Sequence, residues 1–208
     1  VNQIDEESLQ ALDDYSNEMF TFTNYQGDTT TQPRFKFNGL INTNNTIMAN
    51  MQDMSACCDC LIKYNEITAK WGVIVQTPNY VVAMNINDSN MISAITVSPT
   101  DIASSYNFVE CKFPDRTNQD AFNASNLDLA VVEPALLYPN EPVNKASFSL
   151  PLANNSIQAQ YIATRILKAA REDLTITVDV NFIGIQLDAG DVVTMTNANY
   201  GWTNKLFR

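Results

Sequence analysis

Histidine is absent from this chain of 208 residues. Histidine is the commonest general base and metal ligand in proteins, so its absence excludes Ser-His-Asp and Cys-His catalysis within the chain. The 6 glycines are scattered, and they form no phosphate-binding loop, EF-hand loop or nucleophile elbow. No apolar run approaches the ~20 residues that a membrane-spanning helix needs. We therefore expect neither a common catalytic centre nor membrane insertion by this segment.

Positive charge is also scarce, with 12 Lys and Arg residues against 23 Asp and Glu residues and a net charge of -11. Nucleic-acid binding depends on contacts from Lys and Arg to phosphate, and anionic membranes attract the same residues, so neither partner is expected. Two interpretations of the acidic surplus stay open. It keeps a domain soluble, or it lines a passage through which DNA slides without sticking. Charge alone favours solubility by about four to one.

Cysteine is present at four positions, and three of them, Cys57, Cys58 and Cys60, form a cluster apart from Cys111. The cluster lacks the paired Cys-x-x-Cys spacing of zinc ribbons and iron–sulfur sites. On a helix, Cys57 and Cys60 would face the same way, which leaves a weak metal-binding interpretation. Small buried side chains on an apolar helix face are favoured by about eight to one. We expect reduced cysteines without a metal, and the role of the cluster stays open.

Paired carboxylates are relevant because glycosidases need two. The candidate pairs are Asp188 with Asp191, and Glu172 with Asp173. The first pair flanks a glycine turn, where acids favour the turn itself, and the second ends a predicted helix. Turn and solvated-surface interpretations are favoured by about ten to one. The sequence thus predicts no catalytic, cofactor-binding or metal-binding residue, and no enzyme.

Hydrophobic spacing predicts helices at 1–20, 46–62 and 156–172. The helix at 46–62 carries its apolar residues at three- and four-residue spacing: Ile47, Met51, Met54, Cys58 and Leu61. The helix at 156–172 is capped by Asn154 or Asn155. Its apolar face comprises Ile157, Tyr161, Ile162, Ile166, Leu167 and Ala170. We expect Ile162 and Ile166 to be buried against a sheet.

Alternating or short apolar runs predict strands at 34–41, 71–76, 80–84, 91–97, 106–113, 143–150, 174–180 and 192–196. Loops are predicted at 23–33 and 114–126, and a broken strand at 127–138. The segments 174–180 and 192–196 are expected to close a hairpin-like pair. The predicted fold class is α+β, with mainly antiparallel strands and two principal packed helices, 46–62 and 156–172.

Two stretches of the sequence resemble the hub domain of phage tail-tip proteins, the family that includes the host-specificity protein of lambda-type tails. In the last sixty residues the matching positions are Leu150, Pro151, Gln158, Ala159, Ala163, Leu167, Arg171, Thr175–Val178, Leu187, Gly190, Asp191, Val192 and Val193. Earlier in the chain they are Gly39, Ile41, Thr43, Ser55, Ala56, Cys57, Leu61, Tyr64, Lys70, Trp71 and Val73. The glycine that the family usually has before the Lys-Trp pair is missing, and Thr68-Ala69 stands there. Trp71 is interpreted as a core aromatic residue on a strand.

The apolar spacing at the start of the chain predicts an N-terminal helical segment at 1–19. The resemblance implies a first hub-type module at 20–95 and a second at 96–208. The second module is expected to be a small barrel crossed by the helix 156–172. The chain, which starts at Val1 and stops at Arg208, is expected to be a fragment of a longer protein.

The function that the resemblance implies is structural: a virion component at the tail tip, in a self-associated ring such as a homotrimer. That ring joins the tail tube to the receptor-binding fibre or spike, contacts other tail-tip, tube and tape-measure proteins, and serves host attachment and genome ejection. DNA passes through it without specific binding. One alternative is a non-viral, β-rich carbohydrate-binding or adhesin module. A weaker alternative is a hydrolase that uses the turn of Asp188 and Asp191.

Overall fold

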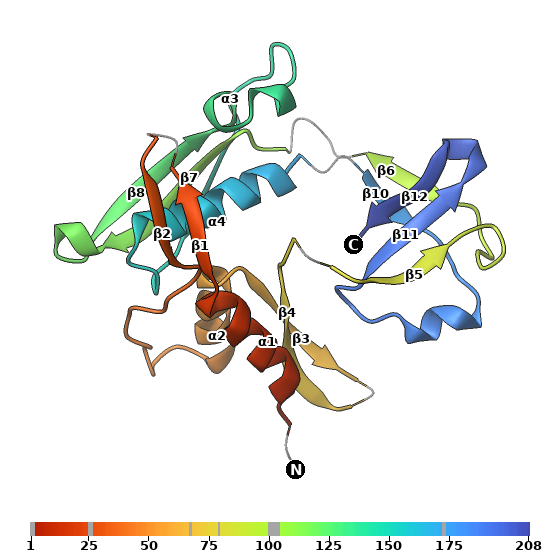
Figure 1. Ribbon diagram of the computed structural model, residues 1–208, viewed down its shortest axis with the longest axis horizontal. Coiled ribbons are helices and arrows are strands. Elements are labelled where there is room, and N and C mark those ends of the chain that lie inside the picture. The colour runs from red at the N-terminus through yellow and green to blue at the C-terminus, as the bar shows by residue number, and fades with distance from the viewer. Residues whose placement is uncertain (1–2, 25–26, 67, 79, 100–104, 172–173) are drawn as a thin grey trace.

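Figure 1 shows the computed structural model, which describes residues 3–24, 27–66, 68–78, 80–99, 105–171 and 174–208. The protein has the predicted α+β class. The α-helices are α1 (Glu6–Asn17), α2 (Ile47–Cys57), α3 (Leu129–Val132) and α4 (Ser156–Ala169). Single 3-10 turns lie at η1 (Arg116–Asn118), η2 (Pro134–Leu136), η3 (Phe182–Gln186) and η4 (Ala198–Tyr200).

Within the described residues, twelve short strands form five small sheets. Two sheets are antiparallel hairpins: β1 (Met19–Thr23) with β2 (Thr29–Pro33), and β3 (Cys60–Asn65) with β4 (Lys70–Val75). A three-stranded sheet has β7 (Phe108–Asp115) between β8 (Ala121–Asp128) and β9 (Lys145–Ser149). Another has β11 (Val192–Asn197) between β12 (Trp202–Phe207) and β5 (Val82–Ile86). The last pairs β6 (Thr96–Pro99) with β10 (Leu174–Thr177).

The small barrel predicted for 96–208 is wrong, because no sheet closes on itself in the part of the chain that the structure describes. Closure requires the outer strands to pair with each other, whereas β7, β8 and β9 form one sheet and β11 belongs to another. The hairpin predicted from 174–180 and 192–196 is also wrong. β10 pairs with β6, and β11 pairs with β12 and β5.

Strand pairing also crosses residue 95, since β5 precedes it and β11 follows it. In Figure 1 the three-stranded sheet of β5, β11 and β12 stands on one side of the molecule, and the helices α1, α2 and α4 stand on the other. Pairing alone does not define which segments fold as units. The division into modules 20–95 and 96–208 therefore stays a prediction.

The main core lies where α4 packs on β7 and β8. Helix α4 begins as predicted, because the Asn155 side chain accepts a hydrogen bond from the Ile157 amide at 2.9 Å. The buried residues of this region include Val109, Cys111, Phe113, Leu127, Ala159, Ile162, Ala163 and Leu167. The burial of Ile162 is confirmed at 1% exposure. Ile166 is only partly buried at the margin of the same core.

Residues 29–33, predicted as part of a loop, form strand β2 instead. The hydroxyls of Thr21 and Thr31 lie 2.8 Å apart across the hairpin, and those of Thr23 and Thr29 lie 2.9 Å apart. β-branched threonines favour extended backbone and pair across strands, which explains a strand without apolar alternation. The strand predicted at 34–41 is absent among the described residues, because the chain turns inward at Phe35 and then runs along the surface.

The helix predicted at 46–62 ends at Cys57, and Cys60 already begins β3. Asp59 between them has a left-handed backbone with φ of 51°, which stops the helix. The predicted apolar stripe does not hold, since Ile47 is 80% exposed and Leu61 is 53% exposed. Cys57 is the only fully buried residue of α2 among those described.

The segments 114–126 and 127–138 also differ from their predictions. Ala121–Asp128 is strand β8, paired along its whole length with β7. Its backbone hydrogen bonds do not require apolar alternation, so a polar strand resembles a loop in sequence. The helix α3 follows because the Asp128 carboxylate accepts a hydrogen bond from the Ala130 amide at 2.9 Å.

Candidate assembly surface

The turn that carries Asp188 and Asp191 is a structural turn with paired side chains. The Asp188 carboxylate accepts hydrogen bonds from Lys63 at 2.8 Å and from Asn65 at 3.2 Å. The hydrogen bond from Lys63 lowers the pKa of Asp188, which is opposite to the raised pKa of a general acid. The Asp191 carboxylate accepts a hydrogen bond from the Asp188 amide at 2.9 Å. The turn interpretation is therefore confirmed for this pair, while Glu172 and Asp173 lie outside the described residues.

All four cysteines are buried and free. Because α2 ends early, Cys57 and Cys60 do not share a helix face; instead the sulfur atoms of Cys58 and Cys60 lie 3.4 Å apart. Burial raises the pKa of Cys57 to about 11 and that of Cys111 to about 12. The described residues contain no group of three metal-ligating side chains. The interpretation as small buried side chains is confirmed, although only Cys57 lies on the helix, whereas Cys58 caps it and Cys60 begins β3.

Gln158 joins three segments that are distant in sequence. Its side chain is 2% exposed. It donates to the Cys57 carbonyl at 2.7 Å and accepts from the Lys36 amide at 3.1 Å. A buried side-chain amide fixes the positions of its partners when its nitrogen and its oxygen both form hydrogen bonds. Gln158, one of the residues shared with the tail-tip pattern, therefore holds the end of α2 and the segment after β2 on α4.

A buried ion pair lies at the other end of α4. The guanidinium of Arg171 and the carboxylate of Glu141 are 2.6 Å apart, and their side chains are 3% and 1% exposed. The Arg171 guanidinium also lies 5.6 Å from the centre of the Tyr138 ring. These contacts fix the turn around Glu141 on the helix. Arg171 also belongs to the resemblance pattern, and the structure gives it a positioning role within the fold.

Trp71 differs from its sequence interpretation. It lies on β4 as predicted, but it is 40% exposed and packs on Tyr64 with ring centres 5.0 Å apart. Its backbone pairs with the N-terminal segment through the Asp5 amide, which donates to the Trp71 carbonyl at 2.8 Å. Trp71 is therefore a surface aromatic residue of a hairpin and does not belong to the core.

The second tryptophan does not form an open platform for a sugar ring. Tyr200 stacks on Trp202 with centres 4.7 Å apart and an interplanar angle of 21°. The Lys205 ammonium lies 5.2 Å from the centre of the same ring. Neighbouring side chains already contact the ring, whereas carbohydrate and cation sites need an accessible aromatic face.

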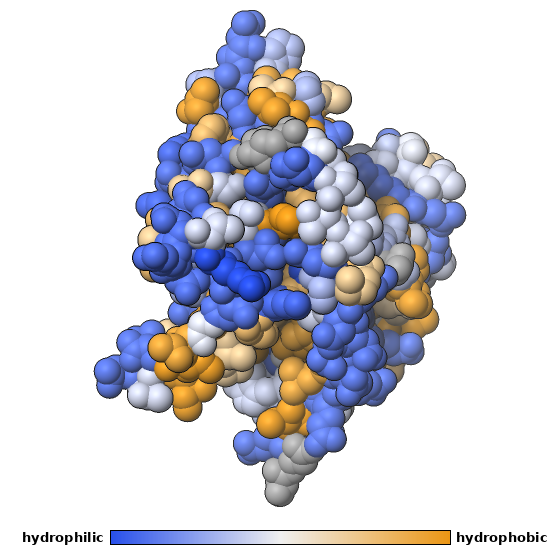
Figure 2. Space-filling model, turned by 60° about the vertical axis from the view of Figure 1, so that its left-hand side comes forward, coloured by the Kyte–Doolittle hydropathy of each residue, from blue (hydrophilic) through white to orange (hydrophobic). Residues whose placement is uncertain are grey.

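Many large apolar side chains reach the surface, and some are almost fully exposed. In Figure 2 such residues form separate groups between hydrophilic ones. The most exposed are Leu40 at 95%, Val81 at 88%, Phe182 at 86%, Ile47 at 80% and Val143 at 79%. Single exposed apolar residues are common on proteins, whereas contiguous groups of them are typical of sites of association with other proteins. They are the best candidate for a functional surface.

Sequence reasoning missed this surface, because it assigned Ile47 to a buried helix face and left residues 182–185 without a role. A signal was present in the charge pattern. No charged residue lies between Lys36 and Asp53, or between Asp179 and Asp188. In an acidic chain, such neutral stretches with apolar residues favour contact surfaces.

Among the described residues no helix is long and apolar enough to cross a membrane. No protein-family model and no curated protein matches the chain. Its fold is similar to that of a chain in a solved structure described as the virion of a native gene transfer agent particle. The TM-score is 0.56, the sequence identity is 17%, and the match covers 71% of this chain. The matched part is 32% of the other chain. At this identity the similarity shows the fold alone.

Proposed function

We propose that the chain is a structural component of a phage-like particle, placed in the hub ring of the tail tip. The observation that carries the proposal is the fold that it shares with a chain of the gene transfer agent virion, over 71% of its length. The sequence pattern of tail-tip hub domains points in the same direction. The proposed setting is a homotrimeric ring between the tail tube and the receptor-binding fibre or spike, in contact with tube and tape-measure proteins.

The exposed apolar side chains support an assembled protein over an isolated one. The side chain of Leu40 is 95% exposed and that of Phe182 is 86% exposed. Contact with neighbouring subunits would remove this apolar surface from water. The net charge of -11 supports a position of the chain in the wall of the DNA channel. Basic residues would pair with the phosphates of moving DNA and slow it. We therefore place the acidic groups toward the lumen and the neutral apolar surfaces between subunits.

The proposed role does not include catalysis. The chain has no histidine, and Asp188 is paired with Lys63. Purified protein should leave peptidoglycan and polysaccharide intact. Hydrolysis that Asp191→Asn abolishes, in a variant that still folds, would contradict this part of the proposal.

The location is tested by imaging intact particles with a label on this chain. We expect the label in a ring around the tail axis at the distal end of the tube. A label on the periphery of the tail, or a map in which Lys and Arg dominate the lumen wall, would overturn the proposal. Monomeric protein that binds a glycan, with no presence in particles, would favour the alternative of a carbohydrate-binding or adhesin module.

A further inference from the structure

Two uncharged apolar surfaces lie on different parts of the molecule. The first, here called the loop surface, is formed by Phe37, Leu40, Ile41, Ile47 and Met48, which are 45% to 95% exposed. The second, here called the η3 surface, is formed by Ile92, Phe182, Ile183 and Ile185, which are 45% to 86% exposed. The turn at 90–92 lies beside the start of η3, because the Ile92 amide donates to the Asp179 carbonyl at 2.9 Å.

The loop surface is held in a defined shape by hydrogen bonds from polar neighbours. The Asn38 amide donates to the Leu152 carbonyl at 2.8 Å. The Asn50 side chain donates to the Asn42 carbonyl at 2.9 Å. These contacts fix the loop to the core at one end and to α2 at the other. A preorganised surface loses less entropy on binding than a flexible one.

The η3 surface is fixed in a similar way. The Asn181 side chain accepts a hydrogen bond from the Ile183 amide at 3.1 Å, and the Asn181 amide donates to the Asn90 carbonyl at 2.8 Å. The turn approaches itself so closely at Gly184 that an added Cβ would overlap the Val180 side chain. Phe182 is thus presented to solvent by a turn whose shape is set by its own packing.

The borders of the two surfaces differ in their charged groups. Lys36 and Arg116 lie beside the loop surface, in one pocket with Asn38 and Asp115. Asp13 lines a second pocket with Phe37. These two carboxylates already accept hydrogen bonds, Asp115 from Thr117 and Asn123, and Asp13 from Asn17. Within the described residues, neither of these basic side chains has an ion pair or hydrogen-bond partner. Asp88 lines a pocket with Ile92 of the η3 surface, and Asp179 precedes η3. Neither carboxylate has an ion pair among the described residues.

This distribution favours a second copy of the same chain as the partner. Two copies that each carry -11 repel one another, so they meet most easily through neutral surface. Contact of the loop surface with the η3 surface also places Lys36 and Arg116 near Asp88 and Asp179. Contact of the η3 surface with its own copy would bring the acidic groups Asp88 and Asp179 together instead.

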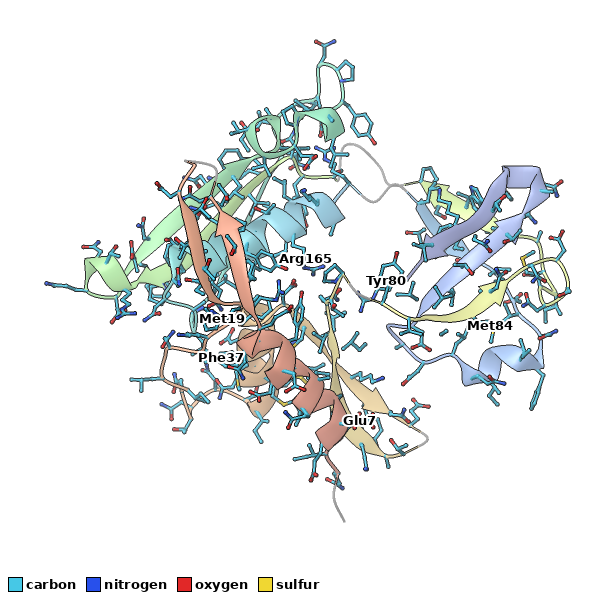
Figure 3. All side chains as sticks on the ribbon, viewed as in Figure 1. Glu7, Met19, Phe37, Tyr80, Met84 and Arg165 are labelled. Atoms are coloured by element: carbon cyan, nitrogen blue, oxygen red, sulfur yellow. The ribbon has the colours of Figure 1, made fainter. Side chains whose placement is uncertain are left out.

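The two surfaces stand on opposite sides of the molecule, which favours a head-to-tail contact. In Figure 1 the loop before α2 lies on the left, and the 3-10 turn between β10 and β11 lies on the right. Figure 3 shows the same separation for Phe37 and Met84, the latter on β5 beside β11. A contact between two different surfaces repeats from copy to copy, and it closes into a ring when the rotation allows.

We propose that copies of this chain associate head to tail, with the loop surface of one copy against the η3 surface of the next. The inference rests on the proposed ring and names the surfaces that form it. Leu40 and Phe182 are the residues best suited to test it, since each is the most exposed apolar side chain of its surface.

Sedimentation velocity of the purified chain tests the inference through two single variants and their mixture. The wild type should associate at concentrations below about 100 µM. Leu40→Asp and Phe182→Asp should each weaken association by at least about 30-fold, because each would place an unpaired charge in the contact. A mixture of the two variants keeps one intact contact, so it should form dimers with one copy of each and nothing larger. Val143→Asp is the matched control, since Val143 is 79% exposed and belongs to neither surface.

Three results would overturn the inference: a wild type that stays monomeric at about 100 µM, variants that associate like the wild type, or an effect of only one variant. Circular dichroism checks that the variants are folded. Association through other surfaces would reject these two surfaces and leave the tail-tip role standing. Absence of the chain from purified particles would reject the tail-tip role and leave the association standing.

Discussion

The side-chain amide of Gln158 donates a hydrogen bond to the backbone carbonyl of Cys57 at 2.7 Å, although the two residues are 101 positions apart in the sequence. Both residues are buried. The contact joins the first turn of α4 to the last residue of α2. Since α4 also packs on β7 and β8, the orientation of α2 on the core depends in part on this single polar group.

Gln158→Ala should destabilise the fold by about 1–3 kcal/mol, because the Cys57 carbonyl and the Lys36 amide would lose their partner in a buried site. Urea unfolding at neutral pH measures the change. Gln52→Ala is a suitable control, since Gln52 is exposed on α2. Equal stability of the Gln158 variant and the control variant would show that the hydrogen bond is dispensable.

Arg171→Met should destabilise the protein by about 3–5 kcal/mol, because it leaves the buried Glu141 carboxylate without its cation. The double variant Arg171→Met with Glu141→Leu should recover most of this loss, since a buried apolar pair of similar size carries no charge that must be neutralised. Equilibrium unfolding of both variants forms the measurement. A double variant as unstable as the single one would contradict the expected coupling.

The same pair should make stability depend on acid pH. Burial raises the pKa of Glu141, but hydrogen bonds from Arg171 and the Tyr138 amide outweigh it, so the pKa lies below its ordinary value. A lowered folded-state pKa contributes stability that is complete above the unfolded-state value and is lost as the pH falls through the folded-state value. We expect the difference in unfolding free energy between the wild type and the double variant to shift against the wild type between about pH 5 and pH 3. A difference that stays constant over this range would refute the assignment to Glu141.

Ile162→Ala should cost about 2–5 kcal/mol, because Ile162 is fully enclosed by the core and its truncation leaves a cavity. Ile166→Ala should cost less than Ile162→Ala, because Ile166 lies at the margin and solvent can fill the space. Thermal and urea unfolding of the two variants compare the sites directly. The prediction fails if the order is reversed, which would place the helix in a different rotation.

The four thiols should react with a disulfide reagent only after unfolding. Each is buried, and the pKa values of Cys57 and Cys111, raised to about 11 and about 12, leave little thiolate at neutral pH. The hydrogen bond from Cys58 lowers the pKa of Cys60, so the protection of Cys60 rests on its burial. We expect native protein to react at least about 100-fold more slowly than protein in urea. Elemental analysis of fresh protein should find no stoichiometric zinc or iron, and about one metal ion per chain would contradict the structural interpretation of the cluster.

The sequence by itself determined those parts that depend on neighbouring residues. Helix α4 with its Asn155 cap, the strands near 71–76 and 192–196, and the turn at Asp188 arise from local spacing and local hydrogen bonds. These interactions span only a few residues, so their pattern is visible in the linear chain. The scarcity of basic residues and the absence of histidine are likewise properties of composition, and from them the sequence predicts neither nucleic-acid binding nor histidine-dependent catalysis.

Only the tertiary structure decided how these elements are partnered and which apolar residues stay in water. The pairing of β5 with β11 and the polar strand β8 come from backbone bonds between distant segments, and such bonds leave no periodic signal in the sequence. Ile47 and Ile162 are the same residue type at helical spacing, yet one is 80% exposed and the other 1% exposed. The difference arises because β7 and β8 cover α4, whereas nothing in the described chain covers the start of α2, and burial depends on the neighbours that the complete fold supplies.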